Sequence, residues 1–193
     1  MTVPKDNILI LTALESELPA TDAPAGVQVR YCGIGKVNAA RAATEAILTL
    51  KPSLLINFGT AGKVRPTLAG LLEVSSVLQR DMMAMPLSPR GVTPLAGPDE
   101  VPRLASGHPG VLCGTGDSFV TATDPWLLEQ EVDVVDMELF AIARTCQFYG
   151  VPWRAFKFIT DDANEASAND WADNVHLGAE LFWRHLHALR NAQ

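Results

Sequence analysis

Val-Val-Asp-Met-Glu-Leu-Phe-Ala-Ile-Ala, residues 134–143, joins a short β-branched run to a segment with the composition of a helix. Two acids, Asp136 and Glu138, lie at this junction. Burying carboxylates at such a place costs free energy unless something binds them. The stretch therefore predicts a binding site at the carboxyl end of a buried strand.

Other segments carry polar groups at equivalent junctions. Two acids follow the first apolar run, and we expect Glu15 to be solvated and Glu17 to be functional. Asn57–Gly62 is either a structural turn or a backbone segment that approaches a ligand, with one threonine hydroxyl projecting from it. Thr160–Asp162 ends the last apolar run. We expect these junctions to converge on one small-molecule site.

Apolar runs of strand length alternate with segments of helical periodicity along the chain. The expected strands are Asn7–Leu14, Val27–Cys32, Ser53–Phe58, Leu71–Leu78, Val111–Gly114, Val132–Asp136 and Trp153–Ile159. The expected helices are Lys36–Leu50, one that begins at Asp124-Pro125, one that follows Asp136 and runs to about Tyr149, and one last helix whose stripe runs from Trp171 to Leu189. This alternation predicts an open α/β sheet with a ligand beyond the carboxyl ends of its strands.

Two further segments have a distinct composition. Gly33–Lys36 precedes the first helix and predicts a tight turn whose backbone N–H groups approach a ligand. It lacks the third glycine of a dinucleotide fingerprint and the Ser or Thr of a P-loop. Arg80–Gly110 is rich in Pro and Gly, so we expect one long loop that packs against a neighbouring subunit.

The bulk composition excludes several classes of protein. The 193 residues are 48% hydrophobic, which is enough for one domain over residues 1–193. A net charge of -7 without a basic run argues against a nucleic-acid partner. Three widely spaced cysteines favour reduced thiols and a cytoplasmic location. The apolar runs are too short to span a bilayer, no signal peptide is visible, and the isolated histidines predict no metal site.

Six motifs in order resemble the nucleoside phosphorylase/nucleosidase family, with the greatest likeness to its 5′-methylthioadenosine/S-adenosylhomocysteine nucleosidases. They are Ala13–Glu17, Gly33–Ala40, Asn57–Gly62, Gly116–Phe119, Val135–Glu138 and Ile159–Ala163. The resemblance implies a three-layer α/β/α fold with a central mixed twisted sheet. It also implies a homodimer or higher homo-oligomer that cleaves the N-glycosidic bond of a purine nucleoside without a cofactor.

The resemblance also implies roles for individual residues. Asp161 matches the acid that protonates N7 of the departing base, and Glu17 matches the acid that activates water. Glu138 matches the acid that holds the ribose 2′- and 3′-hydroxyls. Thr60 would lie near the ribose, Met137 beneath the sugar, Phe119 against the base, and the backbone of Val120 at the base edge. The other residues expected to bind substrate are Ile34, Ala61, Gly62, Asp136 and Ala163.

The residue types fit this chemistry independently of the resemblance. Glycosidic cleavage needs a proton for the leaving group and a base for water, which is the logic of paired carboxylates. The acid must remain protonated near neutral pH, so we expect burial or the neighbouring Asp162 to raise the pKa of Asp161. The loop that contains Glu17 has no basic residue and would repel phosphate, which favours hydrolysis over phosphorolysis.

Alternatives to a methylthioadenosine-type hydrolase remain at this point. A phosphate-dependent phosphorylase is one, and a non-catalytic nucleoside-binding protein is another. In a third, purely structural interpretation, Asp136, Glu138 and Asp161 cap helices or pair with Arg144 and Arg154. The chain is shorter than typical family members after Glu17 and within residues 80–110, so the 5′-substituent stays open, and futalosine-type nucleosides also fit.

Overall fold

One mixed β-sheet forms the centre of the protein in the computed structural model, which describes residues 3–4, 6–97, 101–122, 124–164 and 167–192. Its strands are β1 (Ile8–Thr12), β2 (Val27–Tyr31), β3 (Leu54–Lys63), β4 (Leu71–Gln79), β5 (Arg103–Ala105), β6 (Val111–Thr115), β7 (Val134–Asp136) and β8 (Trp153–Asp161). The helices are the 3₁₀ turn η1 (Ala20–Asp22) and α1 (Lys36–Leu50), α2 (Pro125–Glu129), α3 (Leu139–Tyr149), α4 (Ser167–Asn174) and α5 (Ala179–Asn191).

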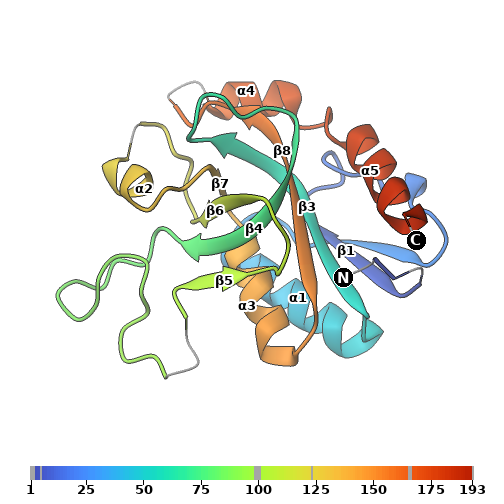
Figure 1. The fold of residues 1–193 in the computed structure, drawn as a ribbon, viewed down its shortest axis with the longest axis horizontal. Helices are drawn as coiled ribbons and strands as arrows, with labels where there is room; N and C mark the ends of the chain where they lie inside the picture. Colours follow the sequence, from blue (N-terminus) through green and yellow to red (C-terminus); the bar gives the residue numbers. More distant parts are fainter. Residues whose placement is uncertain (1–2, 5, 98–100, 123, 165–166, 193) are drawn as a thin grey trace.

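The strand order is β2-β1-β3-β7-β6-β4-β5, and β8 pairs with both β3 and β4 (Figure 1). Strands β2, β1, β3 and β8 run parallel, whereas β8 is antiparallel to β4, and β7 is antiparallel to β3. Because β6 joins β4 to β7, the strands β3, β8, β4, β6 and β7 form a closed ring. The predicted mixed α/β sheet is confirmed, and the ring is a feature that the sequence did not predict.

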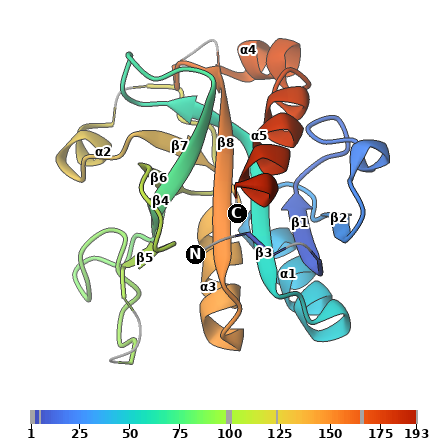
Figure 2. The same cartoon turned by 45° about the vertical axis from the view of Figure 1, so that its right-hand side comes forward.

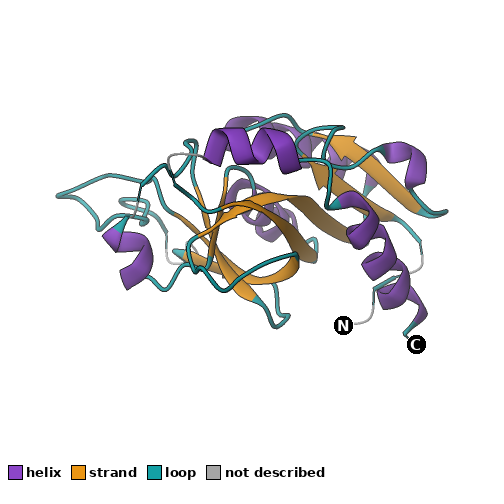
Figure 3. Ribbon diagram, turned by 90° about the horizontal axis from the view of Figure 1, so that it is seen from above, coloured by secondary structure: helices purple, strands orange, loops and turns teal. Residues whose placement is uncertain are grey.

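Helices cover the open part of the sheet on both faces. Helices α1 and α3 lie together on one face (Figure 2), where they bury small residues such as Ala39, Ala43 and Ala143 against the strands. Helix α5 lies on the opposite face, where Phe182 and Leu186 pack against β1, β3 and β8. The view from above shows these layers on either side of the strands (Figure 3). This arrangement gives the predicted three layers.

Helix α1 has the bounds that the sequence predicts, but β3 differs from its prediction. The strand continues to Lys63, so Asn57–Gly62 is not a turn. Residues from Leu55 to Gly62 pair with β8, and Gly62 also faces Val135 of β7. Backbone partners on both sides keep this glycine-containing segment extended.

Two other predictions are wrong, the uninterrupted loop Arg80–Gly110 and the single C-terminal helix. The expected loop Arg80–Gly110 contains β5, which is antiparallel to β4 and buries Leu104; residues 98–100 lie outside the described part of the chain. The expected single C-terminal helix is two helices, α4 and α5, because residues 175–178 form a turn. A Cβ at Gly178 would lie 2.7 Å from Phe158, so the chain turns where the backbone packs directly on this ring.

Candidate active site

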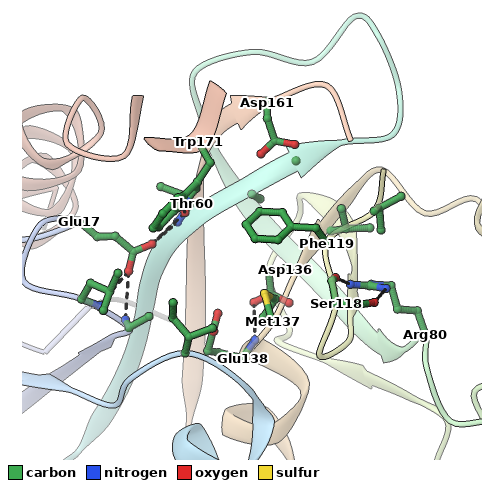
Figure 4. Close-up of a pocket in the computed structure, with 17 residues that line it drawn as sticks. Glu17, Thr60, Arg80, Ser118, Phe119, Asp136, Met137, Glu138, Asp161 and Trp171 are labelled. Atoms are coloured by element: carbon green, nitrogen blue, oxygen red, sulfur yellow. Dashed lines mark hydrogen bonds between the residues drawn. The ribbon is translucent and has the colours of Figure 1, made fainter. Parts of the chain in front are cut away.

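A cavity opens where the carboxyl ends of β1, β3, β6, β7 and β8 meet (Figure 4). All the residues predicted for the site line it except Ala163. The lining consists of Ala13, Leu14, Glu17, Ile34, Thr60, Ala61, Gly62, Arg80, Ser118, Phe119, Val120, Val135, Asp136, Met137, Glu138, Asp161 and Trp171. The structure therefore brings together segments from nearly the whole length of the chain.

Glu17 lies just after β1 and is buried. Its Oε2 atom accepts hydrogen bonds of 3.1 Å from the Thr12 hydroxyl and from the backbone N–H groups of Ala13 and Leu14. Its Oε1 atom accepts hydrogen bonds from the N–H of Thr60 at 3.0 Å and from its hydroxyl at 2.9 Å. These donors fix the orientation of a carboxylate at the edge of the cavity. Glu15 is exposed, as predicted.

Glu138 is buried at the start of α3, and its Oε1 atom accepts a 2.8 Å hydrogen bond from the N–H of Gly35. Burial raises the pKa of Glu138 to about 7, and the negative charge of Asp136 adds to this effect, while Lys157 opposes it. Glu138 therefore changes its charge near neutral pH. The Gly33–Lys36 turn was predicted to bind a ligand through its backbone N–H groups. The N–H of Gly35 instead donates to the Glu138 carboxylate, so this prediction is not supported for that N–H.

Asp136 has a different environment from Glu138, although the two acids are two residues apart. Its carboxylate accepts hydrogen bonds from the hydroxyl of Thr115 and from the N–H of Leu139, the latter at 2.8 Å. It also forms a 2.7 Å ion pair with the ammonium group of Lys157, and neither side chain has more than 1% exposure. Asp136 was predicted to bind substrate. Because its carboxylate is occupied by these protein partners, we instead expect it to hold neighbouring groups of the site in place and not to contact the ligand.

Lys157 and Asp136 form a buried ion pair next to the cavity, and each group shifts the pKa of the other. Burial, the largest single influence, opposes ionisation of Asp136, but Lys157 and the hydrogen bonds from Thr115 and Leu139 together lower the pKa of the carboxyl. Burial also opposes protonation of Lys157, and Asp136 reverses the effect, so the pKa of the amine is above its usual value. In the structural interpretation of the sequence, Arg144 and Arg154 were the expected partners of the site acids. Arg154 instead pairs with Glu73 at 2.8 Å, and Arg144 donates to Gln147.

Asp161 ends β8 and is buried. Its two oxygens accept 3.0 Å hydrogen bonds from the hydroxyl of Thr160 and from the N–H of Ala163. Ala163 thus lies behind the acid and not in the cavity lining. A Cβ at Gly62 would be 2.5 Å from Oδ1 of Asp161, so the acid occupies its position only because residue 62 is glycine. Asp162 points elsewhere and pairs with Lys63 at 2.9 Å.

Phe119 projects into the cavity from the loop after β6 (Figure 4), and the residue is 46% exposed. Arg80 holds this loop, because its guanidinium donates to the carbonyl oxygens of Gly116 and Ser118 and to the hydroxyl of Ser118. Burial lowers the pKa of Arg80 from its usual value, although Asp81 opposes this effect. An exposed aromatic ring on a fixed loop can stack against a planar ligand.

Sequence reasoning missed Arg80 and Trp171 as parts of the site. Arg80 directly follows β4, so the strand-end argument applied to the other segments would have identified it. Trp171 was assigned to the apolar stripe of a helix, and its indole N–H instead donates to the Thr60 hydroxyl at 2.9 Å. The sequence does not predict that contact, because the two residues are 111 positions apart.

The described residues contain no candidate metal cluster and no membrane-spanning helix. No group of three or more His, Cys, Asp or Glu side chains in these residues could hold a metal ion. Within the same ranges, no helix combines the length and the apolar composition needed to cross a membrane.

Known proteins resemble this chain in sequence. Residues 26–189 match the model of the Phosphorylase superfamily. A 5′-methylthioadenosine/S-adenosylhomocysteine nucleosidase of Baumannia cicadellinicola is 31% identical over 168 residues, which cover 74% of this chain and 71% of the relative. A nucleosidase of the same name from Shewanella baltica is 32% identical over 169 residues, covering 75% and 70%.

Solved structures share the fold. A mutant of the Helicobacter pylori methylthioadenosine nucleosidase, with 5′-methylthioadenosine in its active site, superposes with a TM-score of 0.83 at 20% identity, covering 98% of this chain and 100% of the other. The futalosine hydrolase of Helicobacter pylori gives a TM-score of 0.85 at 20% identity, covering 97% and 98%. At this level of identity, the likeness concerns the fold.

Proposed function

Because the chain belongs to the phosphorylase superfamily, we propose that it is an N-glycosyl hydrolase that cleaves a purine nucleoside into free base and ribose moiety. The observation that carries the proposal is the meeting of Glu17, Glu138 and Asp161 in one cavity beside the exposed ring of Phe119. The curated relatives are named as nucleosidases, and they match about three quarters of this chain. We take methylthioadenosine or S-adenosylhomocysteine as the first candidate substrates.

The proposed mechanism divides the work between two acids, one in the loop after β1 and one at the end of β8. Asp161 donates a proton to N7 of the purine, so the base leaves as a neutral molecule. Glu17 accepts a proton from the water that attacks the anomeric carbon. One proton leaves Asp161 and another arrives on Glu17, and exchange with solvent water then reprotonates Asp161 and deprotonates Glu17 before the next turnover. The hydrogen-bond donors around Glu17 and the backbone N–H of Ala163, which donates to Asp161, hold the two carboxyl groups in a fixed geometry.

Glu138 and Phe119 bind the substrate in this proposal. An ionised Glu138 accepts hydrogen bonds from the ribose 2′- and 3′-hydroxyls, and Met137 lies against the sugar. Phe119 stacks on the base, and the backbone of Val120 reads the base edge. Ile34, Ala61 and Gly62 complete the apolar wall, while Asp136 and Ala163 act indirectly by positioning Glu138 and Asp161.

Hydrolysis is favoured over phosphorolysis by the charges around the cavity. Arg80 is the one cation among the described residues that line it, and both of its terminal nitrogens are bonded to the Gly116–Ser118 segment. The ammonium group of Lys157 is paired with Asp136. Incoming phosphate would meet the carboxylates of Glu17 and Glu138 without an available counter-charge.

We further propose that residues 1–193 form one domain that assembles into a homodimer or higher homo-oligomer in the cytoplasm. The segment after β4 exposes the large apolar side chains of Met83, Met85, Leu87 and Leu95, and a group of such side chains suits a contact with another subunit. Cys32, Cys113 and Cys146 are buried free thiols, as expected in a reducing compartment.

A nucleoside panel tests the proposed function. Methylthioadenosine, S-adenosylhomocysteine, adenosine, inosine and futalosine are each incubated with the protein, with and without phosphate, and free base is measured by chromatography. We expect base without phosphate. Base that appears only with phosphate would identify a phosphorylase, and binding of a nucleoside without release of base would identify a non-catalytic binding protein; either result refutes the hydrolase.

A further inference from the structure

The hydroxyl of Thr60 is held between two side chains from distant parts of the chain. Its oxygen accepts a 2.9 Å hydrogen bond from the indole N–H of Trp171, and the hydroxyl donates a 2.9 Å hydrogen bond to Oε1 of Glu17. An indole N–H can only donate, and a hydroxyl has a single hydrogen. The donation from Trp171 therefore leaves the Thr60 hydrogen directed at the Glu17 carboxylate.

The hydrogen-bonded residues Trp171, Thr60 and Glu17 border the cavity. Thr60, Glu17 and Trp171 all line it, and Figure 4 shows the three side chains next to one another. A hydroxyl oxygen has two lone pairs, and Trp171 occupies one of them. The second lone pair of Thr60 has no donor among the described residues, so it is free to accept a hydrogen bond from a water molecule next to Glu17.

Trp171 has a second contact that could give it a different role. Its ring meets the ring of Phe119 edge-on, with centroids 6.4 Å apart and planes at 67°. Through this contact Trp171 could affect the binding of the base and leave the activation of water unchanged. The two roles predict different kinetics, because stacking contributes to binding whereas orientation of the proton acceptor contributes to the chemical step.

We propose that Trp171 is a positioning residue for the reaction: acting through Thr60, it orients the hydroxyl that faces Glu17 and the attacking water. This inference rests on the proposed hydrolase function. Without the indole N–H, the Thr60 hydroxyl rotates and can direct its hydrogen at water, which turns the water away from Glu17. A misplaced reactant of this kind lowers the rate by about 10- to 100-fold.

A double-mutant cycle with Trp171→Phe and Thr60→Val tests the inference, with methylthioadenosine as substrate. We expect Trp171→Phe to lower kcat at least about 10-fold in the wild-type background, with KM within about twofold. In the Thr60→Val background the same substitution should change kcat less than about twofold, because the hydroxyl that it orients is gone.

The matched control is Trp183→Phe. Its indole nitrogen is also buried but has no hydrogen-bond partner among the described residues, so the same change there should leave kcat unaltered. If Trp171→Phe fails to fold, Trp171→3-benzothienylalanine removes only the N–H and keeps the shape of the ring. Far-UV circular dichroism of each variant reports folding.

The possible outcomes are distinct. Equal losses of kcat in both backgrounds would overturn the inference, as would a rise in KM alone or an unchanged kcat. The first two results would assign Trp171 to packing or to base stacking through Phe119. An inactive wild-type protein would refute the proposed function itself and the inference with it, whereas an active wild type separates the two questions.

Discussion

Glu138→Gln should stabilise the protein at alkaline pH and weaken substrate binding at the same time. Glu138 is buried and has one backbone donor, the N–H of Gly35, which an amide oxygen can accept equally well. The substitution keeps the shape of the side chain and removes its negative charge. It therefore isolates the free-energy cost of holding an ionised carboxylate in this cavity.

The sign of the effect follows from the raised pKa of Glu138. Between pH 4.5 and about 7 the unfolded chain releases this proton while the folded protein retains it, so the stability falls as the pH rises through that window. The full shift corresponds to about 3 kcal/mol at pH 8, and about 1 kcal/mol of it is already present at pH 5. The advantage of the variant over wild type should thus grow by about 2 kcal/mol from pH 5 to pH 8.

Urea unfolding of both proteins at pH 5 and pH 8 measures this difference. Glu15→Gln is the matched control, because Glu15 is exposed and the same change there should alter stability less than about 0.5 kcal/mol at either pH. The reasoning fails if the stability difference between Glu138→Gln and wild type is the same at both pH values. Substrate titration of the variant should show a raised KM, since the amide cannot accept hydrogen bonds from both ribose hydroxyls.

Three further predictions concern the acid Asp161 and the buried Lys157–Asp136 ion pair. Asp161→Asn should lower kcat by about 10²–10⁴-fold with an unchanged melting temperature, and near-normal hydrolysis would exclude Asp161 as the acid. Gly62→Ala should also lower kcat at least about 10-fold, because its Cβ would displace the Asp161 carboxylate; Gly97→Ala, with open space around it, is the control and should be neutral. Lys157→Met should destabilise the protein by about 3–5 kcal/mol in urea, because Asp136 is left buried and unpaired. Adding Asp136→Asn should recover part of that loss, and no recovery would contradict the pairing.

The sequence predicted the order of the elements and the principal acids by one physical argument. Apolar runs of strand length must be covered on both faces, which requires alternating helices. Parallel strands end at the same edge of a sheet, so acids that follow such strands are brought close together. This argument holds for Glu17 and Asp161, because β1 and β8 both run parallel to β3. Glu138 follows β7, which is antiparallel to β3, and it reaches the same cavity because the strands close into a ring.

The sequence did not predict the partners of these acids. Lys157 lies in the middle of an apolar strand, and nothing local indicates that it meets Asp136. The sequence also does not indicate the break between α4 and α5, because the helical periodicity continues across Gly178. The turn is explained only by the ring of Phe158, which packs against that glycine.

The sequence by itself determined the α/β class, most of the strands and the acids that follow them, because burial and periodicity are local properties of the chain. Only the tertiary structure decided which acid is paired with a cation, which one titrates near neutral pH, and which hydroxyl faces Glu17. These properties depend on distances between residues such as Thr60 and Trp171, which are 111 positions apart. Electrostatic and hydrogen-bond energies are set by those distances and by burial, and both arise only when the sheet has closed.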